Sequence, residues 1–244
     1  MQSFQSSTWS DVDGLRARCQ ERESGCLADA AQAFAKDLAM SSPTVVLARV
    51  FLLLPMSRLS SADQDFARTF VGGLAGLHPN TPVLTLLGTH GRQAAWRDRK
   101  QSVGHRAIPL LGSEFVGSIP MISKLLADLE VNVAGLDNGT TIATRRMLGG
   151  RNAAFYVEDA RSSLDSSGRV IIPSRDFVET NGVRTVFGMG GAYFDGTLVT
   201  AIVFTNESVD RIIVDRFPSL ISNFKMSTSK IFVRGTIYGD SAAG

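Results

Sequence analysis

The first quarter of the chain changes from helical spacing of its apolar residues to a continuous apolar run. Apolar side chains recur every three or four residues between Leu27 and Leu38, which predicts one apolar helix face. Ser10 indicates the start of this helix, and the serines and proline at 41–43 indicate its end. The next run, TVVLARVFLLL at 44–54, has β-branched residues first and is apolar almost throughout. It predicts a strand that is buried on both faces.

Helix and strand patterns alternate through the middle of the chain. Serine caps and early acidic residues predict a helix in 59–77, although two adjacent glycines weaken its middle. We then expect a strand at 82–91 and a long irregular region at 92–115, followed by a helix at about 119–130 and a third strand at 153–160. Nearer the C-terminus, 207–224 is typical of a helix that Pro218 breaks or kinks. The pattern leaves 229–239 open between strand and helix.

The stretch Val183–Thr205 places glycines between two apolar runs. A dinucleotide-binding loop would need such glycines to open a helix, because helix amides face the pyrophosphate. Here Asp195-Gly196 is typical of a primed hairpin turn, and the run after it is rich in strand-forming residues. We therefore predict a β-hairpin whose glycines permit a bulge or the close approach of another backbone.

The order of these elements favours an α+β domain, in which a central, mainly antiparallel β-sheet carries N- and C-terminal helices. Its 244 residues, 44% of them hydrophobic, suit one domain over 1–244. Within it, 1–43 would be an N-terminal helical segment and 44–244 the α+β core. The alanine-rich face from Leu27 to Leu38 would permit close helix approach.

Charge and composition narrow the classes of partner. A net charge of +2 is too small for non-specific nucleic-acid binding. Arg49 and Pro55 interrupt the longest apolar run, which makes it too short to cross a bilayer. The N-terminus lacks a secretory pattern, so we expect a cytoplasmic protein without membrane insertion. Cys19 and Cys26 fall in the same predicted helix, as buried thiols or as contacts across a dimer.

Three segments together resemble a sensory region found ahead of PAS and histidine-kinase modules in bacterial signalling proteins, a region similar to GAF domains. Its first motif, W-x-x-R-x-x-S-x-x-H-x-x-I-P-L, matches Trp96 to Leu110 in order and spacing. The later motifs match Ser118–Ile122, Ile172 and Pro173, Phe177 and Val178, and Val186 with Gly188, Gly190 and Gly191. The resemblance implies a GAF-like sensory or regulatory domain without catalysis, usually dimeric, that signals to a kinase or another module. Because such domains transmit through helices at their ends, the resemblance also implies that the terminal helices supply the dimer surface.

The segment Arg92–Arg106 is the strongest candidate for ligand binding. It holds five Lys or Arg residues and one acid, Asp98, and so concentrates positive charge. An anionic ligand could pair with its cations, and Trp96 offers a stacking face. Alternatively, this is a solvated loop, or its arginines pair with acids elsewhere. The candidate binding residues here are Trp96, Arg99, His105 and Arg106.

Other residues carry weaker signals. His105 could bind a ligand or haem iron or sense pH, or it could hydrogen-bond a carbonyl and hold the loop. Phe187, Met189 and Tyr193 flank the hairpin bend and could line an apolar pocket or simply fill the core. A second basic cluster lies at 144–151.

Catalysis and metal binding have little support in the sequence. The three histidines have no metal-ligand spacing, and a G-x-S-x-G nucleophile motif is absent. We assign no catalytic residue and no metal ligand, and leave the cofactor open. Two other functions stay open: a small reductase or hydrolase that uses 96–106, and a ligand-free interaction module.

Overall fold

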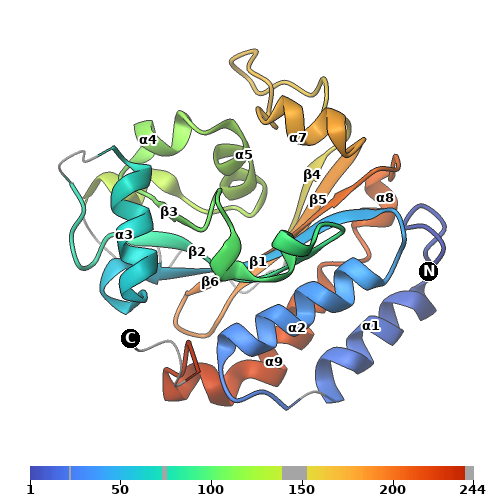
Figure 1. The fold of residues 1–244 in the computed structure, drawn as a ribbon, viewed down its shortest axis with the longest axis horizontal. Helices are drawn as coiled ribbons and strands as arrows, with labels where there is room; N and C mark the ends of the chain where they lie inside the picture. The colour runs from blue at the N-terminus through green and yellow to red at the C-terminus, as the bar shows by residue number, and fades with distance from the viewer. Residues whose placement is uncertain (22, 73–75, 139–152, 240–244) are drawn as a thin grey trace.

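The computed structural model describes residues 1–21, 23–72, 76–138 and 153–239. A single antiparallel sheet of six strands, in the order β3-β2-β1-β6-β5-β4, forms the centre of the fold (Figure 1). β1 lies in the middle of this sheet, between β2 and β6. The strands are β1 (Val45–Pro55), β2 (Pro82–Gly91), β3 (Ala107–Pro109), β4 (Ala153–Val157), β5 (Thr185–Ala192) and β6 (Leu198–Thr205).

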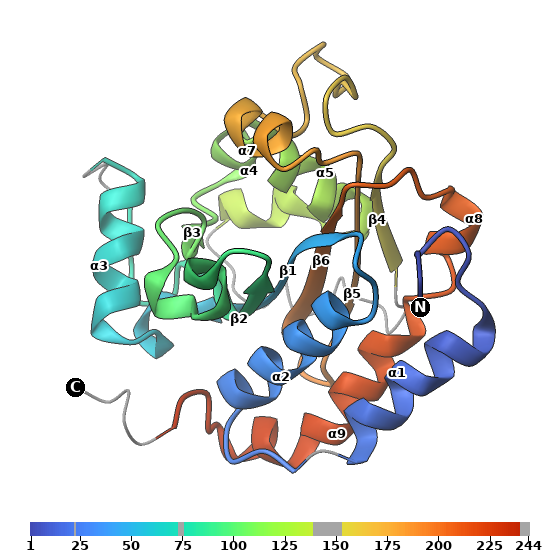
Figure 2. The same cartoon turned by 45° about the vertical axis from the view of Figure 1, so that its right-hand side comes forward.

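Helices from both ends of the chain cover one face of the sheet. They are α1 (Trp9–Glu21), α2 (Leu27–Met40) and α9 (Ser219–Arg234), which lie side by side in Figures 1 and 2. The short helix α8 (Arg211–Val214) precedes α9. On the other side are α4 (Ser113–Gly117), α5 (Pro120–Asp128) and α7 (Arg175–Thr180), while α3 (Ser61–Phe70) packs at the β3 edge. The predicted α+β architecture, with terminal helices on an antiparallel sheet, is confirmed.

The alternating side chains of the strands divide the core in two. On β1, Val50 and Leu52 face the terminal helices, whereas Phe51 and Leu53 face the opposite side. The same alternation runs through β5 and β6, since both faces of a central strand are buried. Any site on this sheet therefore belongs to one face or the other.

The N-terminal helical segment is two helices, so the prediction of one helix with both cysteines was wrong. Thr8 and Asp11 begin α1 with reciprocal hydrogen bonds, since each side chain accepts from the other's backbone amide. The chain then turns, and Cys26 begins α2 by accepting from the Asp29 amide. Cys19 and Cys26 thus lie on separate elements, and both are buried. The break falls at Ser24-Gly25, where a glycine weakens a helix.

The stretch Val183–Thr205 contains the predicted β-hairpin, with β5 and β6 in unbroken antiparallel register. The turn is not a primed two-residue turn. Tyr193 and Thr197 pair across a three-residue loop in which Gly196 has φ +87°, as in a type I turn followed by a left-handed glycine. Gly188 allows the predicted close approach, because a Cβ there would stand 2.7 Å from the Ala201 carbonyl oxygen. The bulge does not occur.

The C-terminal segment, which the pattern left open, is helical as far as Arg234. Pro218 separates α8 from α9 as predicted, and Gly235 ends α9 with φ +72°. The chain then runs back to the start of α2. There the Leu27 and Ala28 amides donate to the carbonyls of Thr236 and Ile237 at 3.0 and 2.9 Å. These carbonyls satisfy helix amides that lack partners within α2. Among the described helices, none combines the length and apolar character needed to cross a bilayer.

Candidate functional site

Loop 92–106 runs along the part of β2 that β3 leaves unpaired. β3 pairs with only three residues of β2, so the remaining backbone groups of that edge need other partners. The Leu86 amide donates to the Arg106 carbonyl at 2.8 Å. The Thr89 hydroxyl donates to the Trp96 carbonyl at 3.1 Å. β2 thus holds the loop at Trp96 and at Arg106.

A buried carboxylate, Asp63 of α3, connects this loop to the C-terminal segment. Asp63 has no exposed surface. It accepts from Arg99 Nη1 at 3.1 Å and from Arg106 Nε at 2.5 Å. The hydroxyls of Ser60 and Tyr238 donate to Asp63 Oδ2 at 2.8 and 3.2 Å. Since Tyr238 follows α9, one carboxylate joins three segments that are distant in the sequence.

Two of the candidate ligand residues, Arg99 and Arg106, are therefore engaged with an acid of the protein itself. The Arg99 guanidinium also lies 4.6 Å from the centre of the Tyr238 ring, within cation–π range. Burial, followed by the nearby Asp63 charge, raises the pKa of Tyr238 and keeps its hydroxyl protonated as a donor. This arrangement matches the alternative in which the loop arginines pair with acids elsewhere.

Arg49 is a charged residue that sequence reasoning noted only as an interruption of an apolar run. It lies on β1, opposite Thr89 of β2 and Ile202 of β6, on the face away from the terminal helices. Its Nη1 donates to the Gly104 carbonyl at 3.1 Å and its Nη2 to the Ser102 hydroxyl at 3.2 Å. Its Nε is buried and has no hydrogen-bond partner among the described residues. Burial lowers the pKa of Arg49 to about 10.

His105 and Trp96 lie near this face. His105 has φ +55°, a left-handed conformation that is uncommon for residues other than glycine. Its ring centre is 6.5 Å from that of Phe70. Loss of solvation, and secondarily the charge of Arg49, lowers the pKa of His105. The Trp96 ring is half-buried and packs edge-to-face on Phe177 at 5.6 Å.

The other three candidates, Phe187, Met189 and Tyr193, belong to the core on the opposite face. Phe187 packs against Phe4 and Phe217, with ring centres 5.1 and 5.6 Å away. The structure therefore does not bring these three residues together with Trp96. The period-two pattern of β5 groups Phe187 with Met189, but it does not tell which face of the sheet they occupy.

Tyr193 is held within the helix layer. Its hydroxyl is 2.7 Å from that of Thr228 on α9, and its ring stacks on Phe232 with centres 3.9 Å apart. Burial raises its pKa, so the hydroxyl remains protonated.

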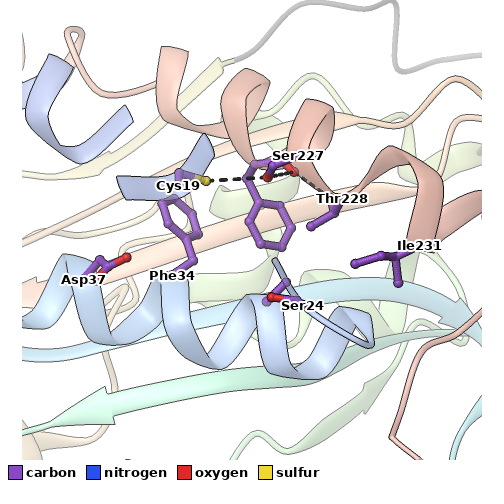
Figure 3. A pocket seen from close by; sticks show the side chains of 9 residues that line it. Cys19, Ser24, Phe34, Asp37, Ser227, Thr228 and Ile231 are labelled. Carbon is purple, nitrogen blue, oxygen red and sulfur yellow. Dashed lines mark hydrogen bonds between the residues drawn. The ribbon is translucent and has the colours of Figure 1, made fainter. Parts of the chain in front are cut away.

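Two hollows lie among the terminal helices. One is a cavity of about 20 Å³ between α1, α2 and α9, enough for a water molecule. Figure 3 shows its lining, where the Cys19 thiol and Ser227 hydroxyl are 3.8 Å apart. The other is a surface groove of about 450 Å³ lined by residues of both α1 and α2, including Asp11, Arg18 and Met40. Both lie on the opposite side of the sheet from Arg49.

The second basic cluster, 144–151, lies outside the described residues. Within the described part of the chain, no group of three or more His, Cys, Asp or Glu side chains is placed to hold a metal ion.

No family model matches the sequence, and no curated protein matches it. Solved structures of GAF domains do match. The phycoerythrobilin-bound GAF domain of a cyanobacterial phytochrome is 8% identical over 94% of this chain and 98% of that chain, with a TM-score of 0.46. A bacteriophytochrome from the photosynthetic bacterium R. palustris is also 8% identical, over 91% of this chain and 37% of that one, with a TM-score of 0.45.

The first of these structures is a GAF domain. The bilin in the first structure belongs to that protein. The functional argument for this chain rests on its own residues.

Proposed function

We propose that residues 1–244 form a non-enzymatic sensory domain of bacterial signal transduction. A small ligand or partner would bind beside loop 92–106, on the sheet face that carries Arg49. The terminal helices of a homodimer would transmit the event to a kinase or another signalling module. The protein would act in the cytoplasm, without membrane insertion or nucleic-acid binding.

The observation that carries this proposal is the position of Asp63 between the loop and the C-terminal segment. Arg99 and Arg106 reach Asp63 from the loop, and Tyr238 reaches it from the segment after α9. That same segment supplies carbonyls to the first amides of α2. A shift of the loop would disturb a buried charge pair, and the disturbance would reach two terminal helices. Asp63 would thus connect the proposed ligand site beside loop 92–106 to the proposed signalling surface on the terminal helices.

Native mass spectrometry of the protein, purified intact from the organism that makes it, tests this function. We expect a small molecule at a fixed ratio to the protein. Hydrogen exchange before and after its removal should differ at 92–106 and at 235–239. A stable partner protein without a small molecule would instead establish an interaction module. Chemical conversion of the bound molecule would establish an enzyme.

Replacing Tyr238 by phenylalanine tests the connection itself. Y238F removes the hydroxyl that donates to Asp63 and retains the ring beside Arg99. We expect the bound molecule to be retained while its effect on hydrogen exchange at 235–239 is lost. Y156F is the matched control, since the Tyr156 hydroxyl donates to the Val209 carbonyl at 2.9 Å, away from Asp63. An unchanged exchange response in Y238F would show that this hydroxyl carries no signal.

The homodimer is a proposal that rests on the outer face of α9. Met226 and Val233 are 62% and 68% exposed there, and their seven-residue spacing places them on one side of the helix. In a dimer, the second copy would cover these apolar side chains. Light scattering should therefore show a dimer that becomes a monomer in the double variant M226E and V233E. The control is I212E on α8, where the isoleucine is 72% exposed. A monomeric wild-type protein would refute the dimer.

A further inference from the structure

We propose that Arg49 binds an oxyanion, the carboxylate or phosphate group of a small organic ligand, on the sheet face away from the terminal helices. This inference rests on the proposed sensory function and names the class of ligand.

Without such a ligand, the burial of the Arg49 charge lowers the stability of the fold. A charge taken out of water needs a partner of opposite charge, or it destabilises the fold. The other buried guanidinium groups near loop 92–106 meet this need, since Arg99 and Arg106 share the Asp63 carboxylate. Among the described residues, Arg49 forms no ion pair, and its two hydrogen bonds go to the neutral oxygens of Gly104 and Ser102.

The geometry leaves donors for an anion. The two hydrogen bonds of Arg49 do not use all the N–H groups of its guanidinium. Its Nε is buried and unpartnered among the described residues, while the residue as a whole keeps some exposed surface. A guanidinium that has free donors and no counter-charge within the described part of the chain suits a carboxylate or phosphate, because both oxyanions accept two parallel hydrogen bonds.

The surroundings of Arg49 suit the rest of a small organic molecule. Ile202 lies beside it on β6, and Leu47 and Phe51 are two residues away along β1 on the same face. The Trp96 ring also belongs to this face. It covers Gly91, the β2 partner of Leu47. Apolar and aromatic side chains around one fixed charge are the usual composition of a small-molecule site.

The His105 side chain is a titratable group close enough to feel the charge of Arg49. Loss of solvation and, after it, the charge of Arg49 lower the pKa of His105, so the imidazole is neutral near pH 7. A bound anion would oppose the effect of Arg49 on His105. Its imidazole could then donate to the ligand from the loop that Arg49 already holds through Gly104 and Ser102.

Anion titrations of the purified full chain test the proposal. The probes are inorganic phosphate and benzoate, with chloride at equal ionic strength as the reference. NMR signals of the arginine Nε–H groups report binding directly, and the Arg49 signal is identified by its absence in R49M. We expect this signal to shift and saturate with phosphate or benzoate but not with chloride. The unfolding temperature should rise in parallel.

Three variants give the comparison. R49M should lose the response, and R49K should bind at least about tenfold more weakly because it keeps the charge but loses the planar group. R68M is the control, since Arg68 forms an exposed ion pair with Asp65 on α3 and should respond as the wild type does. If R49M does not fold, the absence of the signal in R49K identifies it, and the wild-type NMR titration then decides the question.

The outcomes separate this inference from the sensory function. Equal shifts with chloride and both oxyanions, or an unchanged response in R49M, would overturn the anion site. A neutral molecule found by native mass spectrometry, together with a silent Arg49 signal, would refute the anion site and leave the sensory function standing. Saturable binding of an oxyanion at Arg49, alongside chemical conversion of the natural ligand, would keep the site and refute the non-enzymatic role.

Discussion

Replacing Asp63 by asparagine is expected to destabilise the protein by about 3–5 kcal/mol, the usual cost of removing one partner from a buried ion pair. The side chain of Asp63 is fully buried, and those of Arg99 and Arg106 are only 9% and 14% exposed. Asparagine preserves the size of the side chain but leaves both guanidinium groups without a counter-charge. For a chain of this length, the unfolding temperature should fall by roughly 10 °C.

Thermal and urea unfolding of D63N measure this effect, with D65N as the matched control on the same helix. Asp65 pairs with Arg68 at 2.7 Å, but the side chains are 74% and 56% exposed, so water screens this pair. D65N should change the free energy of unfolding by less than about 1 kcal/mol. If D63N were no less stable than D65N, the Asp63 connection could not hold the loop to the C-terminal segment, and the proposed signal route would fail with it.

Elements that carry their own pattern were predictable from the sequence. The apolar face of α2, the buried runs of β1 and β2, and the helix break at Pro218 all occur where the pattern placed them. The hairpin was predictable because Asp195-Gly196 stands between two β-rich runs. In each case the signal is local, since a few neighbouring residues specify the backbone conformation.

Features that depend on distant partners were not predictable in the same way. β3 has only three residues and exists because they pair with β2. Asp63 appeared to be an ordinary acid at a helix start, and only the fold brings Arg99 and Arg106 to it. Arg49 did leave a sequence signal that was passed over. A single charge inside a strand buried on both faces requires either a partner or a ligand.

The face of the sheet on which each candidate residue lies was not predictable, for a related reason. Trp96, as a stacking face, and Phe187, as a pocket lining, were both candidates for ligand binding, but they lie on opposite faces of the sheet. Strand alternation fixes which residues share a face, but packing of helices from elsewhere in the chain decides what covers that face. The terminal helices cover Phe187, and α7 contacts Trp96 through Phe177.

Replacing Gly88 by alanine is expected to disrupt the contact between α2 and the sheet. A Cβ at Gly88 would stand 2.2 Å from the Ala31 carbonyl oxygen and 2.5 Å from the Gln32 amide nitrogen. Both atoms are backbone, so no side-chain rotation relieves the clash and α2 must move away from β2. Overpacking typically costs about 1–3 kcal/mol, and we expect a loss of about 3 kcal/mol or more here because the obstacle is a helix backbone.

Two other glycines provide graded controls in the same unfolding experiment. Gly14 lies on α1 with open space around its Cβ position, so G14A should be neutral or stabilising by up to about 1 kcal/mol. A Cβ at Gly190 would stand 2.5 Å from the side chain of Leu129. Because that side chain can rotate, the loss of stability in G190A should lie between those of G88A and G14A. Equal stability of G88A and G14A would mean that α2 does not lie directly on β2. Residues 235–239 accept hydrogen bonds from the first amides of α2. Without direct contact between α2 and β2, these residues could not act on the sheet through α2.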